Sequence, residues 1–383
     1  MSNRWENKTL GEVCEILDNR RKPITKRDRT AGEYPYYGAT GILDYVHDYI
    51  FDEKLILIGE DGAKWGAGEN TAFIAEGKYW VNNHAHVIRP DRKIVLDNWL
   101  VYFLNFSDLS KYVTGLTVPK LNQAKMREIS LPLPPISEQK KMLHVIDEIF
   151  EKTTKAKENA EKNLQNAREL FESYLQSIFA NPGDDWEEKS VGEIADIEYG
   201  FTDKAKYAGD YRYIRITDID KNGNLVKDGK VFVDASEEAK KYLLKDGDLL
   251  MVRTGATYAK VLLYKDIEKS IFASYLIRIK FRQDIVNKLY WYFSKSRIYW
   301  EQANKLSSGS AQPQFNGGVL KELVFYFPRS FEKQGQIVTK LDALSTEIKK
   351  LEIVYQQKLI DLEELKKPIL HKAFNGELAG VCS

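Results

Sequence analysis

The sequence predicts an α+β protein with two α/β globules, related by pseudo-two-fold symmetry and separated by two long antiparallel helices that form a coiled coil. Two observations carry this prediction. The chain repeats itself once, and each copy changes from a strand-rich segment to a long segment with the spacing of a helical seam. Its 383 residues are also the length expected of two ordinary domains.

Three short segments recur in the same order along the chain. Residues 5–13 return at 186–194, residues 119–122 at 313–316, and residues 175–179 at 370–374. The offsets are 181, 194 and 195 residues, so the second copy carries loop insertions. Such ordered self-similarity indicates two copies of one unit of about 190 residues.

The first two-thirds of each copy has the signals of short strands. Residues 54–59 and 248–252 are apolar runs bounded by turn residues, which is typical of buried strands. Residues 100–104 and 289–293 have the pattern of one short amphipathic helix in each copy. Each copy is therefore expected to begin with an α+β globule.

In the last third of each copy, glycine and proline almost vanish and apolar residues recur at steps of three and four, or of seven. This is the spacing of a coiled-coil seam. In the second copy the predicted seam is Leu341, Leu344, Ile348, Leu351, Tyr355, Leu362, Leu365 and Ile369. Subtracting 195 gives the first copy's seam: Ile146, Ile149, Thr153, Ala156, Ala160, Ala167, Leu170 and Tyr174. Large residues then face small ones, as in a closely packed pair.

The predicted boundaries are 1–137 for the first globule, 138–181 for the first helix, 182–332 for the second globule and 333–377 for the second helix. Ser137–Gln139 begins the first helix in the manner of an N-cap, and Asn375–Gly376 is a stop signal. A helix of 40 residues is about 60 Å long. Duplicated units usually arrange themselves about a two-fold axis. The alternative is two independent domains with solvated helical linkers.

Composition narrows the function classes. The 57 basic and 56 acidic residues give a net charge of +1, which argues against a protein that coats nucleic acid by bulk electrostatics. No apolar run approaches the roughly 20 residues needed to span a bilayer, and the N-terminus lacks the apolar stretch of a signal peptide. The only cysteines, Cys14 and Cys382, exclude a disulfide framework and favour the cytoplasm.

No catalytic constellation stands out, so we expect no catalytic residues, no metal and no cofactor in this chain. The loop of residues 59–68 is glycine-rich but lacks the Gly-Lys-Ser/Thr ending of a phosphate-binding loop. One alternative is an enzyme with its own metal-dependent nuclease site at Glu60, Asp61 and Lys64. The second copy has Arg253-Thr254-Gly255-Ala256 there, without either carboxylate, which argues against that alternative.

Polar side chains suited to phosphate and base contacts stand on glycine-flanked or basic loops. In the first copy they are Arg20, Arg21, Lys22, Lys26, Tyr37, Thr40, Lys64, Asn82, Asn83, His84, Lys120 and Asn122. In the second copy they are Lys204, Lys206, Arg215, Arg253, Thr254, Thr257, Tyr258, Lys260, Ser274, Gln312, Gln314 and Asn316. We expect these residues to contact double-stranded DNA. A coiled-coil scaffold that binds only proteins is a further alternative.

Over essentially its whole length, the chain resembles the specificity subunit of type I restriction–modification enzymes. The resemblance rests on the Trp-Glu-x-Lys-Thr/Ser-x-Gly-Glu motif at the start of each copy and on several segments that are specific as a set. These are residues 34–42, 58–63, 82–87, 213–219, 131–139 and 370–378. The second copy departs from the pattern at its junction, residues 328–334, which leaves the start of the second helix uncertain.

The resemblance implies a non-catalytic subunit in which each globule is a target recognition domain that reads one half of a split, asymmetric DNA sequence. The helices would fix the unread spacer and dock two modification subunits. Those adenine methyltransferases would bind S-adenosylmethionine, and restriction/translocase subunits would join for cleavage. Because the contact loops of the two copies differ, we expect the halves to read different bases.

Overall fold

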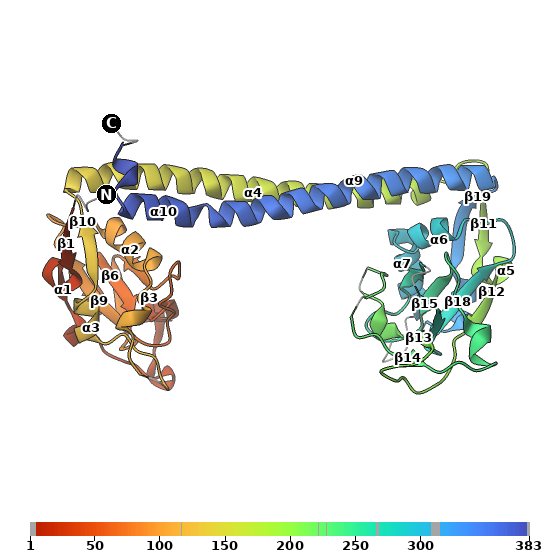
Figure 1. Ribbon diagram of the computed structural model, residues 1–383, viewed down its shortest axis with the longest axis horizontal. Coiled ribbons are helices and arrows are strands. Elements are labelled where there is room, and N and C mark those ends of the chain that lie inside the picture. Colours follow the sequence, from red (N-terminus) through yellow and green to blue (C-terminus); the bar gives the residue numbers. More distant parts are fainter. Residues whose placement is uncertain are drawn as a thin grey trace. The chain divides into compact units, whose positions relative to one another are not determined.

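The chain divides into two units, and each unit combines one globule with parts of two long helices (Figure 1). Unit 1 comprises Met1–Glu161 and Gln356–Ser383, and unit 2 comprises Lys162–Tyr355. The computed structural model describes residues 5–115, 117–220, 222–226, 228–265, 268–307 and 315–380. Strands and helices alternate in both globules, so the predicted α+β class is confirmed.

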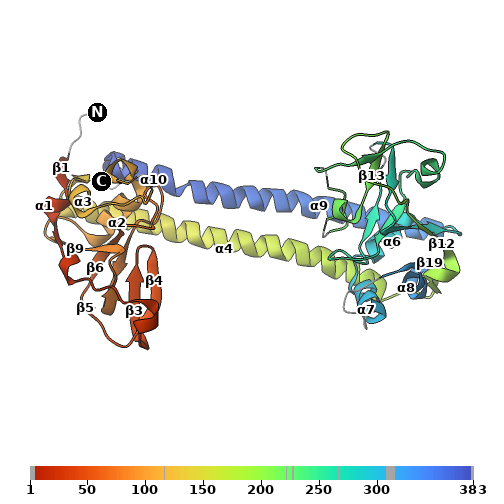
Figure 2. The same cartoon turned by 90° about the horizontal axis from the view of Figure 1, so that it is seen from below.

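The globule of unit 1 is built on two sheets. A four-stranded antiparallel sheet has the order β2-β9-β6-β7, and a mixed sheet has the order β4-β3-β8-β5, in which β3 and β8 are parallel. Figure 2 shows β3 and β4 to one side of β6 and β9. The elements are β1 Glu6–Thr9, α1 Leu10–Val13, β2 Cys14–Ile16, β3 Ala31–Gly38, β4 Gly41–Val46, β5 Phe51–Asp52, β6 Leu55–Gly59, β7 Ala72–Ala75, β8 Lys78–Val81, β9 Ala85–Pro90, α2 Asp97–Phe106, α3 Gln123–Arg127 and β10 Ser130–Leu133.

The globule of unit 2 repeats this plan. Its sheets have the orders β12-β18-β15-β16 and β14-β13-β17, and a pair β11-β19 matches the pair β1-β10 of unit 1. The elements are β11 Trp186–Ser190, α5 Val191–Ile194, β12 Ala195–Tyr199, β13 Tyr211–Ile214, β14 Phe232–Val233, β15 Leu249–Val252, β16 Val261–Leu263, β17 Ser270–Phe272, β18 Leu276–Phe281, α6 Asn287–Phe293, α7 Arg297–Ser307, α8 Gly317–Glu322 and β19 Val324–Pro328. The strands predicted at 54–59 and 248–252 are β6 and β15.

The long helices begin earlier than the sequence predicted, and the second one is interrupted. They are α4 Ile136–Ala180, α9 Phe331–Glu364 and α10 Lys366–Phe374. Helix α4 thus begins two residues before 138, with Ser137 inside it rather than at its cap. The break at Leu365 has a local cause, because Pro368 has no N–H to bond the carbonyl of Glu364 and its ring crowds that carbonyl.

Within each unit, α4 runs antiparallel to the helix beside it. In unit 1, Lys157 Nζ lies 3.2 Å from Glu363 Oε2. Phe150, which comes before Lys157 in α4, lies beside Lys366, which comes after Glu363, so the two helices run in opposite directions. In unit 2, Arg168 Nε lies 2.7 Å from Glu352 Oε1, and Leu175 shares a core with Leu341. These are partly exposed ion pairs, so packing rather than charge holds the helices together.

Each copy's last helical turns close the globule of the other copy. In unit 1 the ring of Phe374, from α10, lies 4.7 Å from Trp99 and 5.4 Å from Phe103 between centroids. In unit 2 the ring of Phe179, from α4, lies 5.2 Å from Phe293. Phe179 and Phe374 end the repeated segments 175–179 and 370–374, so the repeat marks a contact that closes both cores.

A buried glutamine fastens the start of each long helix to its globule. Gln139 Oε1 accepts from the Leu96 N–H at 2.9 Å, and its amide nitrogen donates to the carbonyl oxygens of Ile94 and Pro134. Gln334 makes the same three contacts in unit 2, with Val286, Asp284 and Pro328. Both side chains are fully buried. This latch explains the Gln of the junction motif, which the second copy keeps although its other junction residues differ.

The seam prediction is correct in part. Ile146, Leu341 and Ile348 are buried, and Ile149, Tyr174, Leu344 and Leu362 are half-buried. It is wrong at Leu170, Leu351 and Leu365, which are exposed. Leu365 occupies the break between α9 and α10, so the heptad count does not continue through it, and Leu170 was placed by subtraction from that position. Leu351 is exposed because its neighbour Glu352 occupies the position that faces α4, where it pairs with Arg168.

Among the described residues, the structure contains no helix whose length and apolar character would let it cross a membrane.

Candidate DNA-reading site

Three loops meet at one end of the antiparallel sheet in unit 1. They are the loop after β6 (residues 59–64), the loop before β9 (82–84) and the loop before α3 (117–122), here called the three-loop junction. The Glu60 N–H donates to the carbonyl oxygen of His84 at 2.9 Å, and the Leu121 N–H donates to the carbonyl oxygen of Glu60 at 2.8 Å. These two backbone bonds fix the three loops to one another.

Unit 2 has the same junction with different side chains. The Arg253 N–H donates to the carbonyl oxygen of Tyr275 at 3.0 Å, and the Phe315 N–H donates to the carbonyl oxygen of Arg253 at 2.8 Å. Arg253 therefore occupies the backbone position of Glu60. One scaffold carries a carboxylate in unit 1 and a guanidinium in unit 2, as expected of two sites that recognise different ligands.

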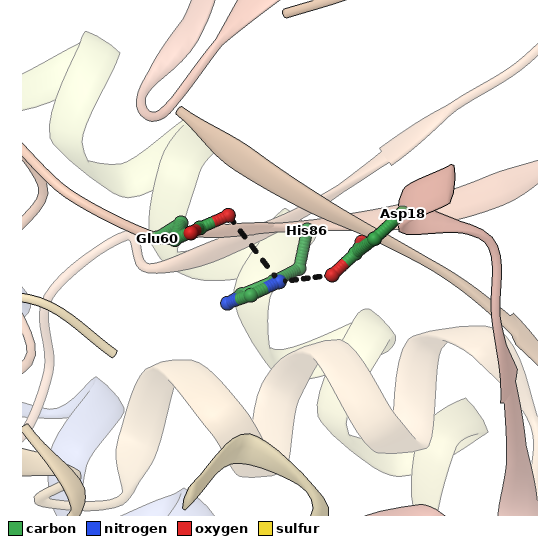
Figure 3. Close-up of side chains that lie close together, drawn as sticks. All are labelled: Asp18, Glu60 and His86. Atoms are coloured by element: carbon green, nitrogen blue, oxygen red, sulfur yellow. Dashed lines mark hydrogen bonds and ion pairs between the residues drawn. The ribbon is translucent and has the colours of Figure 1, made fainter. Parts of the chain in front are cut away.

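The carboxylate of Glu60 belongs to a buried charge network (Figure 3). His86 Nδ1 lies 2.6 Å from Asp18 Oδ2 and 3.6 Å from Glu60 Oε2, and its Nε2 lies 2.6 Å from the carbonyl oxygen of Leu121. Three side chains could thus offer metal ligands within 4.8 Å of one another. The same carboxylates are already paired with Arg21 and Lys120, and these cations oppose a further positive charge. We assign the cluster a structural role.

This network makes a prediction about acid stability. Burial alone would raise the pKa of Glu60, but hydrogen bonds from Lys120 and Arg21 outweigh it and lower the pKa below its ordinary value. A lowered pKa contributes stability above the ordinary glutamate pKa of about 4.3, and this stability is lost as the pH falls through the folded value. Unit 1 should therefore weaken below about pH 4, and Glu60→Gln should be less stable near neutral pH but lose less on acidification.

Hydrogen exchange of the β6 and β9 amides, measured from about pH 7 down to about pH 3, tests this expectation. The control is Glu69→Gln, which alters an exposed carboxylate 3.9 Å from Lys64 Nζ. An identical pH dependence in the parent protein and in Glu60→Gln would show that the network contributes nothing.

The predicted DNA-binding residues of unit 1 fall into two groups. Lys22, Lys26, Thr40 and Asn83 are exposed, and so are Lys64 and His84, although these two contact Glu69 and Asp61. The others are engaged within the protein: Arg20 pairs with Glu53, Arg21 with Glu60, and Lys120 Nζ lies 2.8 Å from Glu60 Oε1. Asn82 is buried and accepts from the His84 N–H at 2.8 Å, and Tyr37 packs against Tyr79. DNA contact by any of them stays a prediction.

In unit 2, Arg253 differs from the other predicted arginines. Arg20, Arg21 and Arg215 each have a carboxylate partner, Asp218 in the last case, whereas no ion pair joins Arg253 to a described carboxylate. Its guanidinium instead lies 5.3 Å from the ring centroid of Tyr199. An arginine held by its backbone and by an aromatic face keeps its donors available to a ligand.

The remaining predicted residues of unit 2 lie in several places. Lys204 is exposed, Lys206 pairs with Asp234, and Thr254, Thr257, Lys260 and Ser274 are half-buried. The Tyr258 hydroxyl donates to Asn304 Oδ1 at 2.7 Å. Gln312 and Gln314 lie outside the described residues. The repeated Asn122 and Asn316 cap α3 and α8, so their recurrence has a structural cause: each side-chain oxygen accepts backbone N–H groups of the helix that follows.

Two aromatic residues beside Arg253 were missed by the sequence analysis. Tyr199 ends β12 and is 43% exposed, and its hydroxyl accepts from the Gly317 N–H; Tyr275 precedes β18 and is 55% exposed. Large aromatic rings left exposed at a loop junction are a signal for binding. The sequence alone could not identify these two tyrosines as exposed, because that depends on their position at the ends of β12 and β18.

The nuclease alternative is not assembled in the structure. Lys64 Nζ lies 3.9 Å from Glu69 Oε1, while Glu60 is held by Arg21 and Lys120. Asp61 is bonded to His84. Glu60 and Asp61 thus share Lys120, which lies 3.9 Å from Asp61 Oδ2, whereas Lys64 pairs elsewhere, so the three proposed residues do not form one cluster.

The comparisons with known proteins agree with one another. The family described as "Type I restriction modification DNA specificity domain" matches residues 2–166 and again residues 183–356. A putative type I restriction enzyme specificity subunit of Haemophilus influenzae is 27% identical over 89% of this chain and 88% of its own length. The MjaVIII specificity subunit of Methanocaldococcus jannaschii is 22% identical over 98% and 93%.

Solved structures show the same fold. The crystal structure of the HsdS subunit from Thermoanaerobacter tengcongensis superimposes with a TM-score of 0.65 at 18% identity, and covers 98% of this chain and 97% of that one. A chain from a structural study of type I R-M complex assembly and conformational transition has a TM-score of 0.73 at 17% identity and covers 98% of both chains.

The two matches to this family together cover most of the chain and define the class of protein as a DNA specificity subunit. The chain belongs to the family of type I restriction–modification specificity subunits. It is a non-catalytic DNA recognition subunit that functions in a complex with other restriction–modification subunits and DNA.

Proposed function

We propose that the two units read the two halves of a bipartite, asymmetric sequence in double-stranded DNA. The observation that carries this proposal is the junction shared by the units, where the same backbone bonds present Glu60 in unit 1 and Arg253 in unit 2. Arginine pairs with two acceptors of guanine, whereas the carboxylate of Glu60 is bound by Arg21 and Lys120, so unit 1 offers no such donor at this position. Sites that offer a guanidinium in one unit and none at the same backbone position in the other would select different bases.

Phosphate contacts would come from lysines around the junctions. Lys22, Lys26 and Lys64 are exposed in unit 1, and Lys204 is exposed in unit 2. Because the whole chain carries a net charge of only +1, these local groups would supply modest affinity. Most of the affinity for the DNA backbone is then expected from partner subunits.

The long helices would set the unread spacer and bind the partners. Helix α4 has 45 residues and is about 68 Å long at 1.5 Å per residue. Its neighbour α9 exposes Leu351, Ile353 and Val354 within unit 2, and such apolar side chains on a helix favour a protein partner. We propose that two methyltransferase (modification) subunits dock on the helices and bind S-adenosylmethionine, and that restriction/translocase subunits join them in the cytoplasm.

Selection from random duplexes tests the bipartite readout. The full chain, assembled with a methyltransferase subunit, is mixed with duplexes that contain a long randomised region, and the bound fraction is sequenced. We expect two short conserved blocks of different sequence, separated by a random stretch of constant length. A single continuous block, or a palindrome, would contradict the proposal.

The exposed helix face predicts a separation between assembly and base preference. Leu351→Asp places a charge at a side chain that is 40% exposed, so folding should be almost unchanged. If partners bind this face, affinity for the methyltransferase subunit should fall about tenfold or more, since desolvating the new carboxylate opposes binding. Calorimetric titration measures this loss, with Asn163→Asp, at an exposed position of α4, as the control. An altered target sequence in Leu351→Asp would contradict the division of roles.

A further inference from the structure

A tyrosine ring lies against the guanidinium of Arg253 in unit 2. Tyr199 ends β12, and its ring centroid lies 5.3 Å from Arg253 Cζ, within the roughly 6 Å over which a cation and an aromatic face attract each other. The Tyr199 hydroxyl accepts from the N–H of Gly317, the first residue of α8, at 2.8 Å. The ring is therefore held twice, by its backbone in β12 and by its hydroxyl at α8.

The contact with α8 leaves no room for a side chain in place of Gly317. A Cβ atom there would lie 2.8 Å from the Tyr199 hydroxyl oxygen, so a residue other than glycine would displace the ring. Two residues earlier, the Phe315 N–H donates to the carbonyl oxygen of Arg253 at 2.8 Å. The same short segment thus fixes both the ring of Tyr199 and the backbone of Arg253.

Unit 1 has a different residue at the position of Tyr199. Asp18 occupies it, because β2 pairs with β9 in the same register as β12 with β18, and the copies are offset by 181 residues there. The Asp18 side chain is 7% exposed, with Oδ2 2.6 Å from His86 Nδ1 (Figure 3), whereas Tyr199 is 43% exposed. Gln123, at the position of Gly317, donates to the same carboxylate at 3.2 Å. Unit 1 fills this place with a buried polar network, and unit 2 fills it with an aromatic face that solvent reaches.

An aromatic face restricts an arginine without occupying its hydrogen-bond donors. A guanidinium in an ion pair directs its N–H groups at a carboxylate, whereas one that lies over a ring keeps them available in its own plane. Ordering a long side chain on binding reduces affinity, so a guanidinium that is already held loses less. Guanine presents two acceptors that match the planar fork, so this arrangement favours guanine over the other bases.

We propose that Tyr199 is the positioning residue of Arg253, and that the pair reads one guanine in the half-target of unit 2. The ring holds the guanidinium in place, and the guanidinium alone contacts the base. The inference rests on the proposed function, since it requires that Arg253 contacts a base. It adds that the residue at the end of β12 determines how strongly guanine is preferred.

A double-mutant cycle on duplex binding tests the coupling between the two residues. The full chain, assembled with a methyltransferase subunit, is titrated with its selected target and with the same duplex changed at the base pair that Arg253→Ala relaxes. Tyr199→Leu should lower the preference for guanine there about 3- to 10-fold and leave the half read by unit 1 unchanged. When Arg253 is already alanine, Tyr199→Leu should have no further effect at that base pair.

Two further variants separate positioning from a purely structural role. Tyr199→Phe keeps the aromatic face and loses the hydrogen bond to Gly317, so its preference for guanine should stay within about twofold of the parent protein. Tyr207→Leu removes a tyrosine that is 98% exposed in the loop after β12, and it should leave this preference unchanged. A loss in Tyr199→Phe as large as in Tyr199→Leu would show that the hydroxyl contact with α8 matters rather than the ring, and would overturn the proposal.

The outcomes also separate this inference from the proposed function. If Arg253→Ala relaxes one base pair and Tyr199→Leu does not, the inference is wrong and the proposed function stands. If Tyr199→Leu still changes the preference when Arg253 is alanine, Tyr199 contacts DNA itself and the positioning role is wrong. If the relaxed base is not guanine, the assignment of the pair to guanine is wrong. If Arg253→Ala changes the preference at no base pair, the base contact and the inference both fail.

Discussion

Replacing Gln334 with alanine should destabilise unit 2 by about 2–4 kcal/mol, because truncating a buried hydrogen-bonding side chain leaves its partners without water or a substitute. The side chain has no solvent exposure and makes three hydrogen bonds, to the Val286 N–H at 2.8 Å and to the carbonyl oxygens of Pro328 and Asp284 at 2.9 and 3.2 Å. All three partners are backbone groups that fasten α9 to its globule. Urea unfolding, followed by hydrogen exchange at β19 and α6, measures the loss.

Matched variants of the same residue type make this test selective. Gln139→Ala should destabilise unit 1 by a similar amount, because it has the same three kinds of backbone partner. Gln336→Ala, two residues beyond Gln334 on an exposed side of α9, should change stability by less than about 0.5 kcal/mol. Equal effects at Gln334 and Gln336 would show that the glutamine latch contributes no more than an ordinary surface residue.

Replacing Arg253 with alanine should relax base preference in one half of the target and leave the other half unchanged. A bidentate arginine contact discriminates by about 1–3 kcal/mol, which corresponds to roughly 5- to 150-fold in binding. The backbone bonds of Arg253 to Tyr275 and Phe315 do not involve its side chain, so the junction should remain intact. Quantitative sequencing of bound duplexes measures preference at every position in both halves.

Lys204→Ala provides the comparison for Arg253→Ala. Lys204 is exposed and is expected to contact phosphate, so its loss should weaken binding to all sequences alike and reduce the salt dependence. Loss of preference in both halves in Arg253→Ala, or an unchanged preference in both halves, would show that Arg253 does not read bases within one half-site.

The fold was largely predictable because the evidence for it is local or repeated. Apolar runs became β6 and β15, the two amphipathic segments became α2 and α6, and the two copies became globules with matching sheets. Helix ends were less predictable. The break at Leu365 depends on Pro368, a single residue that disrupts the helix one turn before its own position. The exposure of Leu351 follows because its neighbour Glu352, and not Leu351, faces α4.

The site was predictable only as a set of loops. Sequence patterns place Arg20, Arg21 and Arg253 on polar segments alike, but Glu53, which pairs with Arg20, and Glu60, which pairs with Arg21 besides the nearby Asp18, lie 33 and 39 residues away along the chain. Only the folded structure distinguishes an arginine in an ion pair from one that lies on Tyr199. The repeated Asn122 and Asn316 show the converse, since their repetition reflects helix capping.

The central claim is that this chain directs methylation to a split, asymmetric sequence, with one half read by each unit. Mapping methylated adenines across a genome, with and without the chain in cells that contain its methyltransferase subunit, tests this most directly. We predict that a two-part motif with a fixed gap is methylated only when the chain is present, and that Arg253→Ala relaxes one part alone. The same methylated sites with and without the chain, or a motif whose parts are inverted copies of each other, would contradict the account.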